Sequence, residues 1–370
     1  MRSGRSRPDA VPEISATDLA RLVGSAEEPF ILDVRQPEEV ADWAIAGAVN
    51  IPLPELPARV HELPREHPIV VVCASGSRSS QATSFLGASG YRAANLTGGM
   101  AAWGRAYDTA SWTLTGGDLV QVRRRGKGCL SYVLGAGSEA FVVDPSVEVG
   151  LYEELAKTRG WRITRVFDTH LHADHVSGAR DLAARTGASL HLSPFDSFKF
   201  GYEPLEEGER FALPGGLALS VAVLHTPGHT EGSVVFRIGD EAVLTGDTIF
   251  VDGVGRPDLA ERAEEFARDL HRSLQSKVLV LPDEAVVFPA HYGDSTTVVP
   301  EQLVSASLGA LRVSLPPLSL DENQFVAWAT DRVMDRPPNY VKIIQANMGR
   351  SPAHPGELAL LEAGPNRCSA

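Results

Sequence analysis

The sequence predicts an α/β protein of two domains: a small domain with a parallel sheet, then a larger domain in which two sheets pack together between helices. Continuous apolar runs at 30–32 and 69–72 are typical of buried strands in a parallel sheet that helices cover on both faces. The pattern changes at the turn-rich segment 112–117, after which strand and helix segments come in two blocks, as in a sheet-on-sheet core. A length of 370 residues also suits two domains of roughly 150 residues each.

The first domain is predicted at residues 12–110, after a disordered tail at 1–11. Its helices are expected at 17–23 and at 79–89, and Gly90 is a stop signal for the second of them. These helices alternate with the two apolar strands, as the parallel arrangement requires.

The second domain is predicted at residues 115–350, followed by a tail at 351–370. It opens with strands that Gly-containing turns join into hairpins, and the basic run 123–127 is interpreted as a solvated hairpin tip. Periodicity predicts strands at 120–122, 130–134, 140–143, 163–167, 221–224, 234–238, 242–244 and 286–288, and helices at 147–158, 176–185 and 261–274.

Composition and charge exclude several classes of protein. Lys and Arg total 34 against 47 Asp and Glu, and the resulting charge of −13 disfavours nucleic-acid binding. No apolar run reaches the ~20 residues that span a bilayer, and no apolar segment follows the N-terminal arginines as in a signal peptide. Three scattered cysteines are too few for a disulfide framework. The sequence therefore predicts a cytoplasmic protein in a reducing compartment, and it leaves open whether the chain forms a homo-oligomer.

Cys73 follows the second apolar strand and precedes a Gly- and Ser-rich turn into a helix. Backbone N–H groups of such a turn and the helix N-terminus stabilise a thiolate, which is the reactive form of cysteine. Arg78 adds a fixed charge whose fork of donors suits an oxyanion. Cysteine also serves as a small apolar residue at strand ends, but this loop favours a reactive thiol.

The first domain resembles the rhodanese family of sulfurtransferases. The resemblance rests on Leu32-Asp33-Val34-Arg35, on the loop from Cys73 to Ser79, and on Leu96-Thr97-Gly98-Gly99-Met100 through Trp103. It implies that Cys73 carries sulfur as a persulfide, that Arg78 lies on the substrate side, and that thiosulfate or sulfite exchanges sulfur there.

Four predicted strand ends in the second domain carry imidazole or carboxylate side chains. Any one of these histidines alone would be read as a hydrogen-bonded core residue, but the spacing of the whole set predicts a metal site. The segments are His170-Leu171-His172-Ala173-Asp174-His175, His225 to His229, Thr245-Gly246-Asp247 and Pro289-Ala290-His291.

This second domain resembles the metallo-β-lactamase superfamily, an αββα sandwich, in the His-x-His-x-Asp-His motif and the three segments that follow it. Members such as glyoxalase II hold two metals and hydrolyse thioesters. For two zinc ions the resemblance implies one site of His170, His172 and His229, a second of Asp174, His175 and His291, and Asp247 as a bridge.

A closer resemblance is to the persulfide dioxygenase family. It is carried by Cys129-Leu130-Ser131-Tyr132, Thr245-Gly246-Asp247, Gly255-Arg256-Pro257-Asp258 and Gln345-Ala346-Asn347-Met348. It implies one Fe(II) per chain, held by His170, His229 and Asp247, with open positions for a substrate sulfur and O₂. Tyr132 would line the pocket and Arg256 would hold the loop or a glutathione carboxylate. The alternatives, a core tyrosine and an ion pair with Asp258, stay open.

The fusion discriminates between these chemistries, because a sulfur carrier shares an intermediate with a persulfide oxygenase but not with a thioester hydrolase. The sequence therefore predicts a bifunctional enzyme. It would oxidise a low-molecular-weight thiol persulfide, such as glutathione persulfide, to sulfite with O₂, and would transfer sulfane sulfur through Cys73. One alternative is a dinuclear zinc hydrolase of the glyoxalase II type with an appended rhodanese module. The other is a rhodanese part that only binds or senses redox state.

Overall fold

The computed structural model describes residues 11–213, 220–257, 262–293, 296–332, 339–351 and 361. The chain divides into two compact units. The first comprises Met1–Asp108 and Arg124–Lys127, and the second Thr109–Arg123 and Gly128–Ala370. The predicted tails, at 1–11 and 351–370, lie almost entirely outside the described residues.

The first unit contains the predicted parallel sheet, with strand order β1-β5-β4-β2-β3. The described pairings of neighbouring strands are all parallel, which confirms this part of the predicted fold. Residues of β4 point alternately to the two faces, and since every one of them is buried, both faces must be covered. The strands are β1 (Glu13–Ile14), β2 (Phe30–Asp33), β3 (Val49–Asn50), β4 (Ile69–Val72) and β5 (Ala93–Leu96).

Helices supply that cover. Residues of α1 (Ala16–Leu22) and α5 (Gly99–Trp103) share one apolar cluster with Val70 and Val72, whereas residues of α3 (Leu56–Arg59) and α4 (Ser77–Ala88) share another with Ile69 and Val71. The short helix α2 (Pro37–Asp42) begins with Pro37 in its first turn, where a missing N–H costs nothing. A 3₁₀ turn follows α3 at Val60–Glu62.

The second unit is the predicted pairing of two sheets. The first has the order β12-β11-β10-β9-β8-β7-β6 and the second the order β13-β14-β15-β16-β17-β18. Strands β6, β11, β12, β13 and β18 are additions to the predicted set, and β6 begins before the turn-rich segment. The first sheet consists of β6 (Tyr107–Leu114), β7 (Gly117–Arg124), β8 (Cys129–Ala136), β9 (Glu139–Val143), β10 (Arg162–Phe167), β11 (Ser189–Leu192) and β12 (Glu203–Pro204). The second consists of β13 (Arg210–Ala212), β14 (Ser220–His225), β15 (Val234–Ile238), β16 (Ala242–Gly246), β17 (Val286–Pro289) and β18 (Ala306–Ser307).

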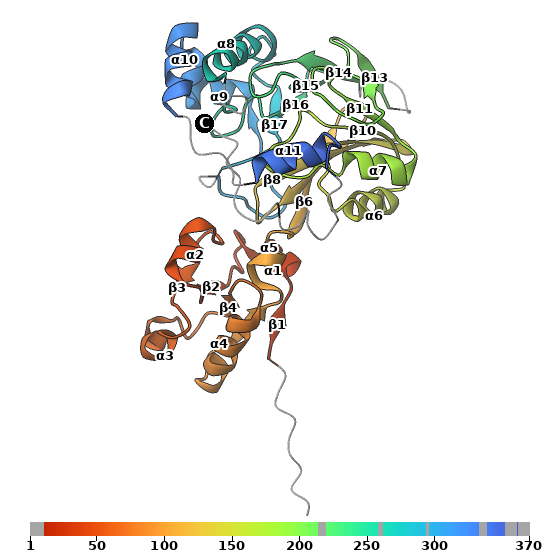
Figure 1. Ribbon diagram of the computed structural model, residues 1–370. Helices are drawn as coiled ribbons and strands as arrows, with labels where there is room; N and C mark the ends of the chain where they lie inside the picture. The colour runs from red at the N-terminus through yellow and green to blue at the C-terminus, as the bar shows by residue number, and fades with distance from the viewer. Residues whose placement is uncertain are drawn as a thin grey trace, which may run out of the picture. The chain divides into compact units, whose positions relative to one another are not determined.

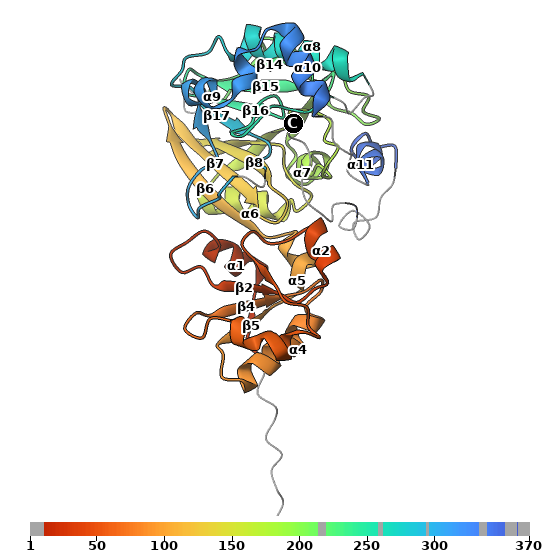
Figure 2. The same cartoon turned by 90° about the vertical axis from the view of Figure 1, so that its left-hand side faces the viewer.

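Apolar side chains from both sheets form the core between them, among them Leu134 and Phe141 from the first sheet and Phe236 and Phe288 from the second. Helices α6 (Gly150–Arg159) and α7 (Ala179–Thr186) lie on the outer side of the first sheet (Figure 1). The outer side of the second sheet packs against α8 (Ala263–Ser273), α9 (Leu308–Ser314) and α10 (Glu322–Asp331), which lie beside β14 to β17 in Figure 2. Among the helices of the described ranges, none is long and apolar enough to cross a bilayer.

The basic run 123–127 is not a solvated hairpin tip, so that interpretation was wrong. Arg123 and Arg124 are buried, and Arg124–Lys127 belongs to the first unit. Arg124 Nε donates to the Gly104 carbonyl at 2.6 Å, and Arg125 forms a buried ion pair with Asp108 at 2.8 Å. Main-chain carbonyls and one carboxylate thus accept hydrogen bonds from guanidinium groups that, from their charge alone, were expected to be exposed to solvent.

Candidate metal centre and reactive cysteine

The candidate ligands meet at one edge of the sandwich because each follows a strand end. His170 comes three residues after β10, His229 four residues after β14, Asp247 directly after β16 and His291 two residues after β17. Strands β16 and β17 are parallel neighbours, so their carboxyl ends bring Asp247 and His291 together. His291 Nδ1 lies 2.6 Å from Asp247 Oδ1.

His170, His229 and Asp247 form one compact set whose ligand atoms all lie within 4.8 Å of one another. Asp247 Oδ2 is 3.3 Å from His229 Nε2 and 3.7 Å from His170 Nε2. These three atoms are buried and have no hydrogen-bond partner among the described residues. Buried polar atoms without a partner are costly, and a divalent cation fits two imidazole nitrogens and one carboxylate oxygen.

The remaining polar atoms of this set hold the candidate ligands in the form that metal binding requires. His229 Nδ1 donates to the Arg256 carbonyl at 3.0 Å, so its lone pair is on Nε2. His170 Nδ1 lies 2.9 Å from Thr169 Oγ1. Burial, together with the neighbouring His172, holds the pKa of His170 well below its usual range, and burial also lowers the pKa of His229. Both imidazoles are therefore neutral, as metal ligation requires.

His172 lies beside this set and has its own orienting carboxylate. Its ring centroid is 4.2 Å from that of His170, its Nε2 is 3.1 Å from Asp144 Oδ1, and its Nδ1 has no partner in the described part of the chain. Asp144 was missed in the sequence, although it follows β9 as the other candidates follow their strands. The φ of Asp144 is 53°, which is rare for a residue other than glycine. Backbone strain of this kind is often found at functional sites.

Asp174, His175 and His291 form a second set, and the structure adds Cys129 to it. Asp174 lies 2.8 Å from His291 Nε2, 3.1 Å from His175 Nδ1 and 3.7 Å from Cys129 Sγ. Burial opposes protonation of His175, but the Asp174 carboxylate outweighs it and raises the pKa of His175 to about 10. In the sequence, Cys129 stands out only as part of the resemblance to persulfide dioxygenases. No local pattern connects it with the other members of this set, which lie 45 or more positions away.

Asn347, at the end of α11 (Tyr340–Asn347), fastens the loop that carries these histidines. Its Nδ2 donates to the carbonyls of His172 and His175, both at 2.9 Å, and its Oδ1 accepts the Ser177 amide at 2.9 Å. Because both carbonyls belong to candidate ligands, Asn347 fixes the backbone of the segment that carries them.

We expect Asn347→Asp to weaken metal binding by roughly tenfold, because a carboxylate then faces two carbonyl oxygens in place of a donor. Competition with a chelator measures the affinity. Asn339→Asp makes the same chemical change at the other end of α11 and serves as the control. Equal affinity in the two variants contradicts the positioning role.

The two predicted substrate residues are both buried. Tyr132 belongs to the core between the sheets, and its hydroxyl donates to the Pro289 carbonyl. Arg256 is 2% exposed, and its main-chain carbonyl is the acceptor for His229. Asp258, the alternative partner of Arg256, lies outside the described residues. A substrate contact by either side chain stays a prediction.

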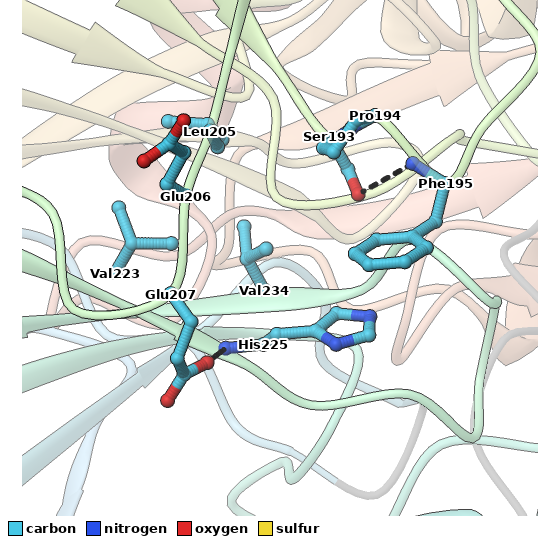
Figure 3. Close-up of a pocket in the computed structure, with 9 residues that line it drawn as sticks. All are labelled: Ser193, Pro194, Phe195, Leu205, Glu206, Glu207, Val223, His225 and Val234. Atoms are coloured by element: carbon cyan, nitrogen blue, oxygen red, sulfur yellow. Dashed lines mark hydrogen bonds between the residues drawn. The ribbon is translucent and has the colours of Figure 1, made fainter.

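A separate cavity of about 240 Å³ lies at the ends of β11 and β14 (Figure 3). The ring of Phe195 lies parallel to the His225 imidazole, with centroids 4.2 Å apart. His225 Nε2 lies 2.8 Å from the Glu231 carbonyl, so this histidine belongs to the cavity wall and not to the ligand sets. The wall consists of Ser193, Pro194, Phe195, Leu205, Glu206, Glu207, Val223, His225 and Val234.

The Cys73 loop of the first unit surrounds the sulfur with donors. Cys73 Sγ accepts from the Gly76 amide at 3.1 Å and from the Ser79 hydroxyl at 3.2 Å. Gly99 allows the backbone to come close, because a Cβ there would lie 2.2 Å from the Cys73 carbonyl oxygen. Burial opposes ionisation of the thiol, but bonds from Ser79 and from loop amides outweigh it and lower the pKa of Cys73.

We expect Ser79→Ala to move the pH dependence of Cys73 alkylation by iodoacetamide to higher pH. The thiolate reacts, so the rate rises as the pH passes the Cys73 pKa, and loss of a donor raises that pKa. The rate at neutral pH should fall roughly tenfold, as expected for one bond to a charged acceptor. Ser84→Ala, on the exposed side of the same helix, is the control. An unchanged profile contradicts the role of Ser79.

Comparisons with known proteins agree with the division of the chain into two compact units. Residues 15–106 match the rhodanese-like domain, and residues 124–291 match the metallo-beta-lactamase superfamily. An uncharacterized protein of Mycobacterium tuberculosis is 34% identical over 217 residues, which are 50% of this chain and 94% of that protein. The mitochondrial persulfide dioxygenase ETHE1 of Homo sapiens is 29% identical over 237 residues (59% and 82%), and a hydroxyacylglutathione hydrolase of Methylococcus capsulatus is 39% identical over 160 residues (42% and 58%). The crystal structure of ETHE1 from Myxococcus xanthus superposes with a TM-score of 0.52 at 25% identity, covering 68% of this chain and 99% of that one.

Proposed function

Because the chain belongs to the metallo-beta-lactamase superfamily and carries an N-terminal rhodanese-like domain, we propose that it is a bifunctional enzyme of sulfur oxidation. Residues 115–350 act as a persulfide dioxygenase, which converts a low-molecular-weight thiol persulfide, O₂ and water into the thiol and sulfite. Residues 12–110 transfer sulfane sulfur through Cys73. Glutathione persulfide is the proposed substrate, thiosulfate or sulfite the exchange partner, and the cytoplasm the proposed location.

The observation that carries this proposal is the convergence of three buried ligand atoms, on His170, His229 and Asp247, that have no hydrogen-bond partner among the residues the structure describes. Two imidazoles and one carboxylate are the ligand set of non-haem Fe(II) oxygenases. An iron bound there supplies open coordination positions and one-electron chemistry for a reaction between a persulfide sulfur and O₂. Similarity to the human persulfide dioxygenase supports the choice of this reaction within the superfamily.

The chain's own residues orient the ligands and keep bulk water away. Thr169, the Arg256 carbonyl and Asp144 fix the rings of His170, His229 and His172 through their second polar atoms. Burial opposes ionisation of Asp247, but His291 outweighs it and lowers the pKa of this carboxyl, so Asp247 keeps its negative charge. A fixed carboxylate and neutral imidazoles would hold a divalent ion without further reorganisation of these side chains.

In the first unit, the Cys73 thiolate attacks the outer sulfur of a donor. The donor's S–S bond breaks, the leaving thiolate or sulfite takes the bonding electrons, and Cys73 becomes a persulfide. Attack of an acceptor on that persulfide reverses the same exchange. The loop amides and the Ser79 hydroxyl stabilise the thiolate as nucleophile and as leaving group.

The second set, of Cys129, Asp174, His175 and His291, favours an alternative. It could hold a second cation, and a dinuclear zinc site that activates water would suit a thioester hydrolase like the hydroxyacylglutathione hydrolase relatives.

Two assays on the purified full-length protein separate these functions. The proposal expects O₂ uptake with glutathione persulfide and no hydrolysis of an acyl-glutathione thioester. Thioester hydrolysis without O₂ uptake supports the alternative and overturns the dioxygenase.

A further inference from the structure

Arg78, the cation beside the Cys73 loop, is engaged by a carboxylate. Its Nη1 and Nη2 donate to Glu39 Oε2 and Oε1 at 2.8 and 2.7 Å, a bidentate pair in which both side chains are about one third exposed. Such pairs are geometrically specific but weak at the surface, so an incoming anion has to compete with Glu39 for Arg78.

Glu39 keeps its position independently of Arg78. Its Oε2 accepts the Gln36 amide at 3.1 Å in the capping box that begins α2, and its carbonyl accepts Arg35 Nη1 at 3.1 Å. Arg35 in turn forms a buried ion pair with Asp33 at 2.7 Å. The negative charge therefore stays beside the loop when the Arg78 side chain moves.

Arg78 directly precedes Ser79, whose hydroxyl donates to Cys73 Sγ at 3.2 Å, so the guanidinium lies within electrostatic reach of the reactive sulfur. The Glu39 carboxylate raises the pKa of Arg78 against the opposing effect of burial, and Cys73 adds a smaller rise. The Glu39 carboxylate neutralises the charge of Arg78 and so weakens the attraction of an anionic sulfur donor to the region of Cys73 Sγ. This electrostatic effect increases with the negative charge of the donor.

We propose that Glu39 determines which sulfur donors the loop accepts, by disfavouring dianions such as thiosulfate relative to donors of lower negative charge. This inference rests on the proposed sulfur transfer by Cys73. The exchange itself is unchanged: the donor's S–S bond breaks, its leaving group takes the electron pair, and no external oxidant is required.

A charge series of donors tests the proposal on the full-length protein under anaerobic conditions. The donors are thiosulfate (2−), methanethiosulfonate (1−) and cysteamine persulfide, whose ammonium group offsets its persulfide charge. For Glu39→Gln we expect kcat/KM to rise about tenfold, about threefold and not at all, respectively. Glu38→Gln removes the same charge from an exposed neighbour in the same turn, and it should leave all three values nearly unchanged.

An equal change for all three donors, or no change, overturns the proposal, because a residue that only supports the loop does not distinguish charge. Alkylation of Cys73 gives a readout independent of turnover: in Glu39→Gln the ratio of the iodoacetate to the iodoacetamide rate should rise about threefold. A wild-type protein inactive with every donor contradicts sulfur transfer, and the alkylation ratio still decides whether Glu39 sets the charge at Cys73. An unchanged ratio counts against Glu39.

Discussion

Asp247→Asn is expected to lower persulfide-dependent O₂ uptake by at least about 1,000-fold, the equivalent of ~4 kcal/mol. Asp247 provides the carboxylate oxygen that lies 3.3 Å from His229 Nε2 and 3.7 Å from His170 Nε2. An amide of the same shape removes the one negative charge of the predicted ligand set. The variant should therefore lose its iron as well as its activity, and metal analysis and an oxygen electrode measure the two losses.

The control for this change is Asp240→Asn, which makes the same replacement at a carboxylate that is 75% exposed. It should retain iron and O₂ uptake. Sulfur transfer should remain intact in Asp247→Asn, since Cys73 belongs to the other compact unit. Full O₂ uptake in Asp247→Asn contradicts the assigned ligand.

Cys73→Ser is expected to abolish sulfur transfer, by at least about 1,000-fold, while iron content and O₂ uptake stay near the wild-type level. A serine hydroxyl does not ionise near neutral pH and cannot carry sulfane sulfur, so neither half of the exchange can proceed. Release of sulfite from thiosulfate and O₂ consumption, measured on the same preparation, give the two activities.

Together with Asp247→Asn, this variant forms a reciprocal pair in which each change removes one activity. Transfer that persists in Cys73→Ser means that another group carries the sulfur. Loss of both activities in either variant contradicts two separate centres.

Much of the candidate site could be predicted because its residues follow the ends of predicted strands. His170, His229, Asp247 and His291 each follow a strand that apolar periodicity makes visible, and neighbouring strand ends meet at one edge of a sheet. The parallel sheet of the first unit could be predicted from its continuous apolar runs. Alternate residues of Ile69–Val72 are buried on opposite faces of that sheet, as such a run indicates.

What the sequence does not display are the partners that orient these groups. Asn347 bonds to His172 across 175 residues, and Glu39 bonds to Arg78 across 39. Such contacts depend on how helices, strands and loops pack against one another. The hydrophobic periodicity of a single segment does not show this. Arg124 illustrates the same limit, since its charge suggests solvent whereas its Nε is satisfied by the buried Gly104 carbonyl.

The most direct test of the account is one preparation of the anaerobically purified full-length protein, analysed for metals and then given glutathione persulfide in buffer of known O₂ content. We expect about one iron per chain and one sulfite formed for each O₂ consumed. Two zinc ions per chain, with no O₂ consumed, would contradict it.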